Sequence, residues 1–537
     1  MKLVDRVLKS VGLQRATAQP VRSGSFRAIN VAYQAAQIDR MTEDWVVALL
    51  SPDQEIRMAL RNLRARARQL AINNPHCKRF LDSAEEQVIG PSGVGLEVAF
   101  SDNILGKDAA SAIATNIARE FANWATCSSA DGQMSLTEQA RLWLRGFLAD
   151  GESFVQHLRG YPHNDYAYAL LPVDPDQVDV TWHRLKSPES KTGENEIRMG
   201  VEVDVYRRPI AYWLYSGHPS EFSGVTRERV PANQISHAYA MRRVGQTRGV
   251  PHMHAAMFLM NMLGEYDKAE VVASRMAACK MAFFVSKTGE EYSSAKSNRD
   301  GGPLTVSAEA GTIEELPEGI EPKVVDWQHP SHNYETFSLA CLRGIAAGLG
   351  SSYATLTGDL RSVNFSSIRQ GILSERDSWA LMQRFLIDHF YWPVFKSWLP
   401  MAMLTGRVKL PPGMQAQDVY DAVLWTPRGW DWVDPYKDVQ ASVAAIRSGL
   451  STFQRECAKR GLDYKKVFEQ RKRENNLASE LGLALDLTTS GAGGVQGDTE
   501  ETEEERGVAP VKTPGTKNPP PPPAKNKNSI GVLRLPE

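Results

Sequence analysis

Two long helical patterns with a strand-rich stretch between them constrain the fold of this chain more than any other sequence feature. Apolar residues recur at helical spacing from His252 to Lys280, which predicts a helix about 40 Å long. The same spacing returns between Pro330 and Leu349, whereas residues 281–330 have the composition of strands and turns. The sequence therefore predicts a small β-containing unit that protrudes from the body on paired helices.

The second helical pattern is interrupted by small and polar residues before it resumes. Gly348 to Asp359 is rich in glycine, serine and threonine, which are poor residues for a continuous apolar stripe. After Asn364 the apolar spacing predicts a longer helix, which is expected to end at Pro393 because proline blocks further helical hydrogen bonding. A helix, a polar loop and a long helix are expected in this order.

The first 250 residues predict a body of mixed helices and strands. Ser51 followed by Pro52 is typical of a helix start, and this helix is expected to reach Ala71. Alternating apolar residues from Phe154 onward, and again over Val201–Tyr215, predict strands. This order of elements places the chain in the α+β class.

Five arginines lie along that first helix, at Arg57, Arg61, Arg64, Arg66 and Arg68. They could face nucleic acid, but a solvated or subunit-interface face is the favoured interpretation for a run of charges. The formal net charge of −1 also argues against tight binding of duplex DNA, since neutralisation of phosphates supplies most of that affinity. Loose passage of DNA is compatible with this charge.

The size and composition are those of a globular protein with several structural regions. The 537 residues exceed the size at which one core stops growing, and 42% of them are apolar, an ordinary fraction. No stretch approaches the roughly 18 apolar residues of a membrane span, and no signal peptide is expected. Five scattered cysteines fit no zinc motif and indicate a reducing compartment.

No group of titratable residues has the spacing of a catalytic or metal-binding motif. His252 and His254 are two residues apart and lack the glutamate of a zinc-protease helix. Asp174 and Asp176 could hold a cation, yet Asx turns beside prolines are the preferred explanation. The sequence therefore predicts no enzyme, no cofactor and no metal site.

Two other pairs have ordinary structural explanations. His76 precedes Cys77, and a buried thiol is favoured over a catalytic Cys/His pair. Asp431 and Asp434 lie among tryptophans that could resemble a sugar site, but a junction packed by tryptophan and proline is preferred. Neither pair adds a prediction of chemistry.

Seven short motifs occur in an order that resembles a known family. They are Leu63–Arg68 with Asn73-Asn74 and Val88-Ile89-Gly90, Asp150-Gly151-Glu152, Arg207–Leu214 with His218-Pro219, Gly245–Pro251, Ile345–Tyr353, Asn364–Arg369, and Trp432–Pro435 with Gly449–Thr452. Each motif alone is weak, but their common order is specific. Together they are similar to the lambda-type family of tailed-phage portal proteins, over roughly residues 25–485.

The resemblance implies a portal-type subunit of several parts, with long helices, that assembles into a ring. Mapped by order, the parts are an N-terminal arm (1–24), an α+β wing (25–250), a first stem helix (252–280), a clip (281–330), a second stem helix (333–349), a tunnel loop (350–366), a long helix and return through the wing (367–414), a helical crown (415–485) and a disordered tail (486–537). Composition also predicts the disordered tail, because an acidic run and a run of five prolines cannot form a core.

The resemblance also implies a function as the ring, usually dodecameric, at one vertex of the virion capsid, assembled in the bacterial host cytoplasm. Double-stranded DNA would pass through the ring during packaging and ejection without being read. The tunnel-loop residues expected to face it are Ser351, Ser352, Tyr353, Thr355, Thr357, Asp359 and Arg361. The implied protein partners are the terminase large subunit, the major capsid and scaffold proteins, and the head-completion and tail-joining proteins, with no membrane involved.

Two other functions stay open at the level of the sequence. A nuclease-like, nucleic-acid-processing enzyme is suggested by the arginines at 57–68 and the carboxylates near Asp174. A different phage head or scaffold protein would also have a helical contact with the shell.

The clip is expected to dock the terminase through charged residues, namely Lys287, Glu290, Glu291 and Arg299. Removing residues 285–325 should abolish binding of the terminase large subunit, because these charges are lost with the segment. A pull-down with purified rings measures this. Full terminase binding by intact rings of the shortened chain would contradict the assignment.

Overall fold

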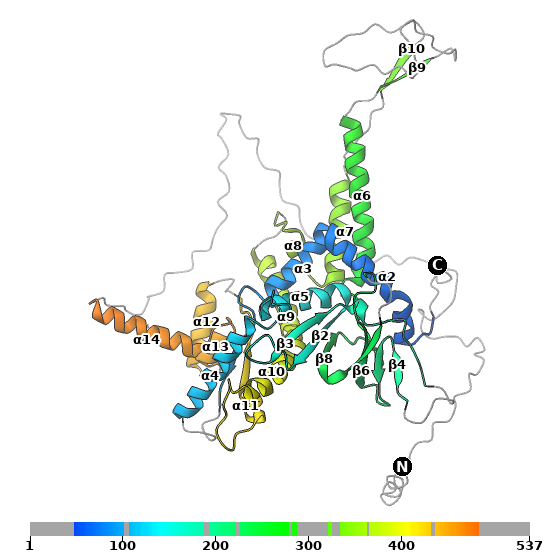
Figure 1. Cartoon of the computed structure of the whole chain (residues 1–537). Helices are drawn as coiled ribbons and strands as arrows, with labels where there is room; N and C mark the ends of the chain where they lie inside the picture. The colour runs from blue at the N-terminus through cyan, green and yellow to red at the C-terminus, as the bar shows by residue number, and fades with distance from the viewer. Residues whose placement is uncertain are drawn as a thin grey trace, which may run out of the picture. The chain divides into compact units, whose positions relative to one another are not determined.

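The computed structural model describes the larger part of the chain, and it divides into two compact units. The described residues are 48–100, 107–186, 194–221, 226–278, 282–286, 320–324, 333–361, 365–430 and 435–482. Unit 1 is Met1–Phe468, and unit 2 is Glu469–Glu537, of which residues 469–482 are described. Figure 1 shows the course of the elements. The predicted N-terminal arm and the tail 486–537 lie outside the described residues.

Four helices are described in the first part of the chain, and three of them begin at capping residues. They are α2 (Pro52–Asn73), α3 (Pro75–Val88), α4 (Lys107–Ala125) and α5 (Leu136–Asp150). The Ser51 side chain accepts a hydrogen bond from the Gln54 amide, and the Gln54 side chain accepts one from the Ser51 amide. Asn74 ends α2 and its side chain caps α3. The predicted start of the first helix is confirmed.

Antiparallel sheets follow these helices, which confirms the α+β class. One sheet has the order β3 (Tyr168–Val173), β2 (Glu152–Arg159), β8 (Ile235–Tyr239), and another has the order β4 (Glu196–Arg198), β5 (Val201–Val203), β6 (Pro209–Tyr215), β7 (Arg227–Pro231). A third pairs β1 (Gly95–Val98) with β11 (Val423–Thr426). Short 3-10 turns, η2 (Pro175–Gln177) and η3 (Ala232–Gln234), lie after β3 and before β8. In the central strand, Phe154 is paired with Val173 on one side and His237 on the other.

The helices predicted on both sides of the strand-rich stretch are present, and they pack as an antiparallel pair. They are α6 (His254–Ala278) and α7 (Tyr334–Leu349), and they lie side by side in Figure 1. A Cβ placed on Gly348, near the end of α7, would come within 3.1 Å of the Cβ of Ala256 at the start of α6. Farther along the pair, Tyr334 donates a hydrogen bond to Asp267. Glycine thus permits the close approach of the helices near the body.

The β-containing unit between these helices is a two-stranded antiparallel pair within the described residues. It consists of β9 (Ala282–Ser286) and β10 (Ile320–Val324), with Phe284 opposite Pro322. Chain order places the pair between the end of α6 and the start of α7. The rest of the predicted clip lies outside the described residues.

The predicted tunnel loop contains a short helix rather than loop alone. α8 (Tyr353–Thr357) begins at Ser352, whose side chain accepts a hydrogen bond from the Thr355 amide, and it ends at Gly358 with a φ of 71°. Serine and threonine lower the helix propensity of the stretch, yet the Ser352 cap and the left-handed Gly358 end stabilise one turn and a half. The apolar spacing alone did not predict this helix.

The long helix does not end at Pro393, contrary to the prediction. α9 (Phe365–Leu386) passes into a π-helical turn, η4 (Ile387–Tyr391), and then into α10 (Trp392–Leu404). Pro393 lies in the first turn of α10, and the π-helical turn immediately before it reorganises the hydrogen bonds that a proline would break. Pro400 also lies inside α10.

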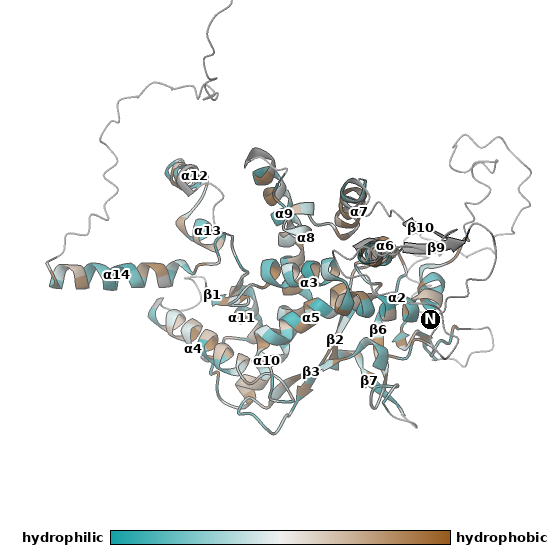
Figure 2. Cartoon of the chain, turned by 90° about the horizontal axis from the view of Figure 1, so that it is seen from above, coloured by the Kyte–Doolittle hydropathy of each residue, from teal (hydrophilic) through white to brown (hydrophobic). Residues whose placement is uncertain are grey.

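The C-terminal part is helical, as predicted for the crown region. Its elements are α11 (Ala416–Ala422), α12 (Pro435–Arg447), α13 (Phe453–Ala458) and α14 (Tyr464–Glu480). Figure 2 shows that α14 is hydrophilic along much of its length. Helix α14 continues from unit 1 into unit 2.

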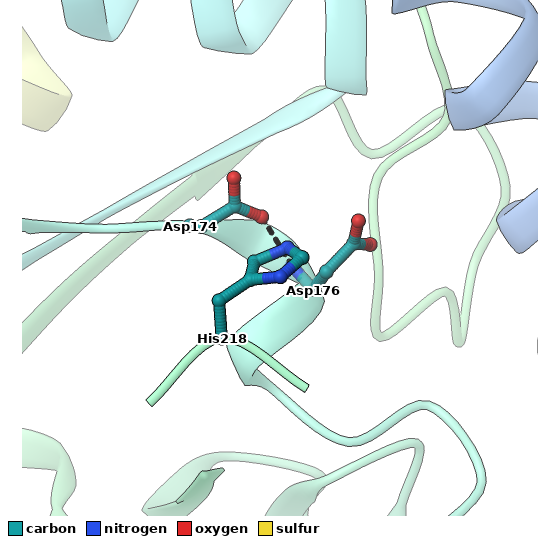
Figure 3. A group of neighbouring side chains, drawn as sticks. All are labelled: Asp174, Asp176 and His218. Atoms are coloured by element: carbon teal, nitrogen blue, oxygen red, sulfur yellow. Dashed lines mark hydrogen bonds between the residues drawn. The ribbon is translucent and has the colours of Figure 1, made fainter. Parts of the chain in front are cut away.

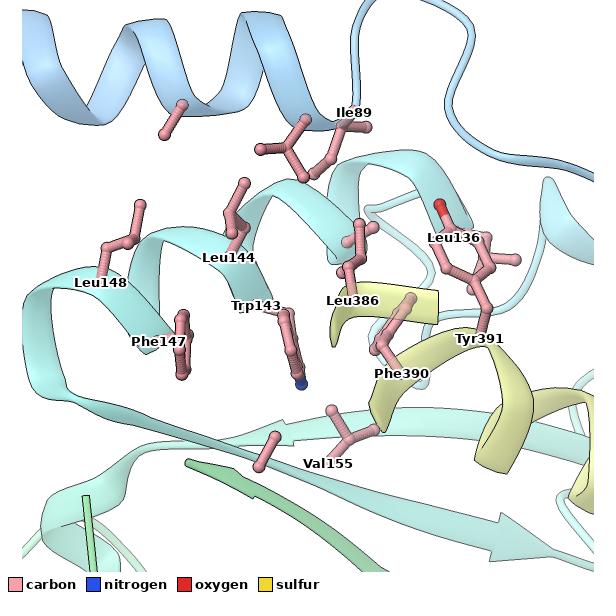
Figure 4. Packing of buried hydrophobic residues seen from close by; sticks show 14 of the residues in the cluster. Ile89, Leu136, Trp143, Leu144, Phe147, Leu148, Val155, Leu386, Phe390 and Tyr391 are labelled. Carbon is pink, nitrogen blue, oxygen red and sulfur yellow. The ribbon is translucent and has the colours of Figure 1, made fainter. Parts of the chain in front are cut away.

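The main core is built around α5, which buries two faces. Figure 4 shows Leu144 and Leu148 directed toward α3, while Trp143 and Phe147 are directed toward β2 and the π-helical turn. The Trp143 ring lies 5.8 Å from that of Phe390. A helix with apolar side chains on two faces requires cover from both sides, and α3 and the α9–α10 region supply it.

Candidate DNA-facing segment and a buried ionic cluster

The segment from Ser351 to Thr355 is attached to α9 by one carboxylate. Glu375 Oε1 accepts hydrogen bonds from Ser351 Oγ at 2.8 Å and from the Ser352 amide at 3.2 Å. Its Oε2 accepts one from Thr355 Oγ1 at 2.7 Å. The hydroxyl groups of Ser351 and Thr355 therefore bind the protein, although both side chains are partly exposed.

The last part of the segment is held by an exposed ionic group. Arg361 donates to both oxygens of Asp359, each at 3.0 Å, and lies 3.3 Å from the Glu335 carboxylate. Tyr353 donates its hydroxyl hydrogen to Asp359 as well. The hydrogen bond from Arg361 is the main reason that the pKa of the Asp359 carboxyl lies below its usual value. Since the Arg361 side chain is 76% exposed, its charge is available to an anion in solvent.

The middle of the segment packs on the body. Leu356 is buried in the main core, and Arg79 of α3 donates a long hydrogen bond to the Thr355 carbonyl. Thr357 donates its hydroxyl hydrogen to the Tyr353 carbonyl inside α8. Of the residues expected to face DNA, Arg361 is therefore the one with the most exposed side chain, and the DNA contact itself stays a prediction.

Several predicted site residues lie outside the described residues. They are Lys287, Glu290, Glu291 and Arg299 of the clip, together with Asp431 and Asp434. Trp425 and Trp430, which precede the last pair, pack against the main core, in agreement with the predicted junction. Trp430 also donates its indole N–H to Gln87.

A buried ionic cluster joins three of the motifs that carry the family resemblance. Glu152, fully buried at the start of β2, accepts hydrogen bonds from Arg248 Nη2 at 2.7 Å and from Arg64 Nη2. It also accepts from the Gly249 amide at 3.0 Å and from His237 Nε2 at 2.9 Å. Burial opposes ionisation, yet the guanidinium groups of Arg248 and Arg64 hold the pKa of the Glu152 carboxyl well below its usual range.

The same two arginines bind backbone carbonyls from several elements. Arg248 Nη1 donates to Met199 at 2.6 Å and to Val178 at 3.2 Å, while Arg64 Nη1 donates to Pro175 at 3.3 Å. These bonds connect α2 and the 246–250 segment with both large sheets. Planar guanidinium groups suit this task, because each offers several donors in fixed directions.

Two glycines permit the backbone contact beside this cluster. Gly151 has a φ of 86°, and a Cβ there would lie 2.0 Å from the carbonyl carbon of Val250. A Cβ on Gly249 would meet the Gly151 carbonyl oxygen at the same distance. The Asp150-Gly151-Glu152 motif and the Gly245–Pro251 motif therefore meet backbone to backbone, which only glycine allows.

The structure corrects the interpretation of the arginine helix for two of its five arginines, Arg64 and Arg68. Arg64 is buried in the ionic cluster, and Arg68 pairs with Asp150 at 2.6 Å and with Asp176 at 2.8 Å. Neither faces nucleic acid or forms a solvated stripe. The pattern misled because these charges pair with carboxylates far away in the sequence. Arg57, Arg61 and Arg66 are exposed, as the favoured interpretation expected.

The pair Asp174 and Asp176 forms a turn, as preferred from the sequence. Asp174 accepts a hydrogen bond from the Asp176 amide at 2.8 Å and caps η2. Figure 3 shows His218 beside both carboxylates, and single ligand atoms of the three residues lie within 4.8 Å of one another. Arg68 pairs with both carboxylates, at 3.1 Å from Asp174 and 2.8 Å from Asp176, and Arg64 pairs with Asp176 at 3.2 Å. The group is therefore an ion-paired turn.

The histidine and cysteine candidates have ordinary structural roles in the core and at a helix start. The ring of His252 stacks on Phe80, and burial lowers its pKa to about 4. Cys77 is buried, and desolvation raises the pKa of its thiol to about 12, so the predicted buried thiol is confirmed. His254 bonds to the Pro251 carbonyl at the start of α6.

An exposed apolar row on α6 was not identified residue by residue from the sequence. Phe258, Met262 and Val272 are 78%, 51% and 52% exposed. At about 100° per residue, Met262 and Val272 each lie within about 40° of Phe258 around the helix. Met257 and Met260 point inward instead. The residues of one periodic pattern are thus divided between the core and a surface that the described residues leave exposed.

Comparison with known proteins places the chain in one family. The model of the family described as phage portal protein, lambda family, matches residues 39–383. A probable portal protein of Halomonas phage phiHAP-1 is 31% identical over 507 residues, covering 91% of this chain and 95% of the relative. Portal protein B of Escherichia phage lambda is 25% identical over 493 residues, covering 83% and 89%.

Among solved structures, a chain of the virion of a native gene transfer agent particle matches with a TM-score of 0.42 and 13% identity, covering 74% of this chain and 93% of that chain. The extent of the family match and the identity to the Halomonas phage protein decide the assignment. The chain belongs to the lambda family of phage portal proteins. It is a portal protein of a tailed-phage head and, as such, a component of the virion. No helix among the described residues is long and apolar enough to cross a membrane.

Replacing Glu152 with glutamine should destabilise the fold by about 3–5 kcal/mol, because two buried arginines lose their carboxylate. Chemical denaturation followed by tryptophan fluorescence measures the change. The matched control is Glu55→Gln, which breaks an exposed pair with Arg243 and should cost about 0–1 kcal/mol. Equal effects of the two substitutions would contradict a stabilising role of the cluster.

Proposed function

We propose that copies of this chain close into a dodecameric ring at one vertex of the phage head, and that double-stranded DNA passes through its centre. The observation that supports ring formation best is the exposed apolar row on α6. Large apolar side chains in a row, unburied in one chain, are typical of a surface that another chain covers. A head-to-tail contact between copies that closes on itself produces a ring.

The stem pair presents this row in a form suited to such a contact. Phe258, Met262 and Val272 follow one side of α6, and Phe337 on α7 is 51% exposed. The two helices are joined by aromatic contact, since Tyr266 of α6 stacks with Tyr334 of α7 at a ring distance of 5.9 Å. One side of the helix pair therefore offers several exposed apolar side chains, with the exposed Glu265 between Met262 and Val272.

The segment 350–361 is the proposed DNA-facing part of the ring. Its exposed cation, Arg361, is paired with Asp359 and Glu335 in solvent, where ion pairs are weak and a phosphate can compete. Each segment would offer one arginine, which is already paired with carboxylates, and the whole chain has a net charge of −1. Such a surface would bind phosphates only weakly, which suits a channel through which DNA must slide. The contact would carry no sequence information, because it reaches phosphates rather than bases.

The proposal includes no catalytic step for this chain. Packaging would take its energy from a terminase docked on the clip, and capsid, scaffold, head-completion and tail-joining proteins would contact other surfaces. Assembly would take place in the bacterial host cytoplasm. The ion-paired state of Asp174 and Asp176 supports a non-catalytic role over the nuclease alternative.

Electron microscopy of the purified full-length chain should show rings with a central hole, and class averages give the number of subunits. Phe258→Glu should shift the protein from rings toward monomers, because a charge would be desolvated in an apolar contact. Leu404→Glu is the control, since Leu404 is equally exposed on α10, outside the stem. A stable monomer of the unsubstituted chain at high concentration would refute the ring, and rings of Phe258→Glu at normal yield would refute this interface.

Arg361→Gln should lower the salt dependence of duplex binding by purified rings, since each neutralised phosphate releases counterions. The slope of log affinity against log salt concentration measures it. The control, Arg407→Gln, removes an exposed arginine that pairs with Asp165 in the wing. An unchanged slope for Arg361→Gln would place the DNA contact elsewhere.

A further inference from the structure

Glu375 is a largely buried carboxylate that family resemblance did not single out. It lies on α9, and the residue is 8% exposed. Each of its bonds goes to the segment that precedes α9: Ser351 Oγ at 2.8 Å, the Ser352 amide at 3.2 Å and Thr355 Oγ1 at 2.7 Å. Three donors from one turn therefore converge on one side chain.

The helix that carries Glu375 is fixed to the body nearby. Trp379, one turn later on α9, is buried and lies 6.3 Å from Phe80 of α3, ring to ring. Gln383, one turn further, donates to the Val88 carbonyl and, at 2.9 Å, to the Arg428 carbonyl. Glu375 thus projects from a rigid support, and the segment 351–355 is positioned against it.

The bond pattern requires a carboxylate in particular. An ionised glutamate offers only acceptors, and here Oε1 receives two donors while Oε2 receives the third. A glutamine would keep one oxygen and direct an N–H group toward Thr355, whose hydroxyl group can turn to accept it. An alanine would leave all three donors without this partner. Glutamine at position 375 should therefore weaken the attachment of the segment 351–355, and alanine should weaken it more.

We propose that Glu375 is a positioning residue that sets the path of the segment 350–361 and so places Arg361 at the channel. This inference rests on the proposed DNA-facing role of that segment. Glu375 would not touch DNA, because its oxygens are already bound to protein donors. From Ser352 to Arg361 the chain passes through α8, so a shift of the helix start moves the arginine with it.

Hydrogen exchange on purified rings of the full-length chain tests the attachment without DNA. The reporters are the amides of Leu356 and Gly358, which donate to the carbonyls of Ser352 and Ala354 within the α8 turn. Glu375→Ala should accelerate their exchange about tenfold, as expected from losing hydrogen bonds to a charged group. Glu375→Gln should give an intermediate rate.

The matched control is Asp377→Asn, which removes the same charge from an exposed position two residues along α9. It should leave the exchange at Leu356 and Gly358 unchanged. If Glu375→Ala prevents ring formation, Thr355→Val replaces it, since that substitution removes one of the three donors at nearly constant volume. If the variant that forms rings, Glu375→Ala or Thr355→Val, shows unchanged hydrogen exchange at Leu356 and Gly358, the proposed attachment to Glu375 is overturned.

The functional part is measured as the amount of genome packaged per particle in the phage. Glu375→Ala should reduce packaging, Glu375→Gln should restore part of it, and Asp377→Asn should have no effect. If Arg361→Gln reduces packaging while Glu375→Ala accelerates exchange without reducing packaging, the positioning role is overturned. If neither substitution affects packaging, the proposed DNA-facing function has failed, and the positioning role falls with it even where the exchange result stands.

Discussion

The buried carboxylate of Glu152 is the interaction on which the packing of α2 and the two large sheets depends. Its oxygens bind two buried guanidinium groups, a backbone amide and a histidine, which belong to three separate parts of the chain. Desolvating such charges is expensive, and the cost is offset only when every donor and acceptor is satisfied. The carbonyls of Val178 and Met199 accept further hydrogen bonds from Arg248 and so help to satisfy its donors. The arrangement fixes both large sheets against α2.

The aromatic core extends this rigidity to the helices that carry the candidate site. Phe121 of α4 packs against Phe395 and Trp398 of α10, with ring distances of 5.6 and 5.1 Å. Because α9, the π-helical turn and α10 form one continuous helical path, the position of α10 in the core determines the line of α9. The position of α9 in turn determines where Glu375 and the segment attached to it lie.

Helix α6 leaves the large apolar side chains of Phe258, Met262 and Val272 exposed. Exposed apolar residues also occur elsewhere, such as Ile72 on α2 and Tyr206 between β5 and β6. In the proposed ring, the row on α6 is a surface for contact with other copies. The family membership and the exposed row are independent observations that support the same proposal.

Several features could be predicted from the sequence because their causes are local. Ser51 and Asn74 cap helices through bonds to residues three positions away, and the periodicity of α6 depends on neighbours one or two turns apart. The ordered motifs were enough to indicate the family. Local rules failed at Pro393, where a π-helical turn lets the helical path continue.

What only the tertiary structure decided involves partners that are distant in the sequence. Arg64 looked like one of five surface charges, but Glu152, 88 positions away, draws it into the interior. The sequence suggested that Ser351 and Thr355 could contact DNA, but Glu375 on α9 accepts hydrogen bonds from both hydroxyl groups. The sequence determined the elements and the family, since those depend on short-range spacing. The fold decided which polar groups are satisfied inside the protein and which are left for a ligand, because a hydrogen bond depends on distance in space.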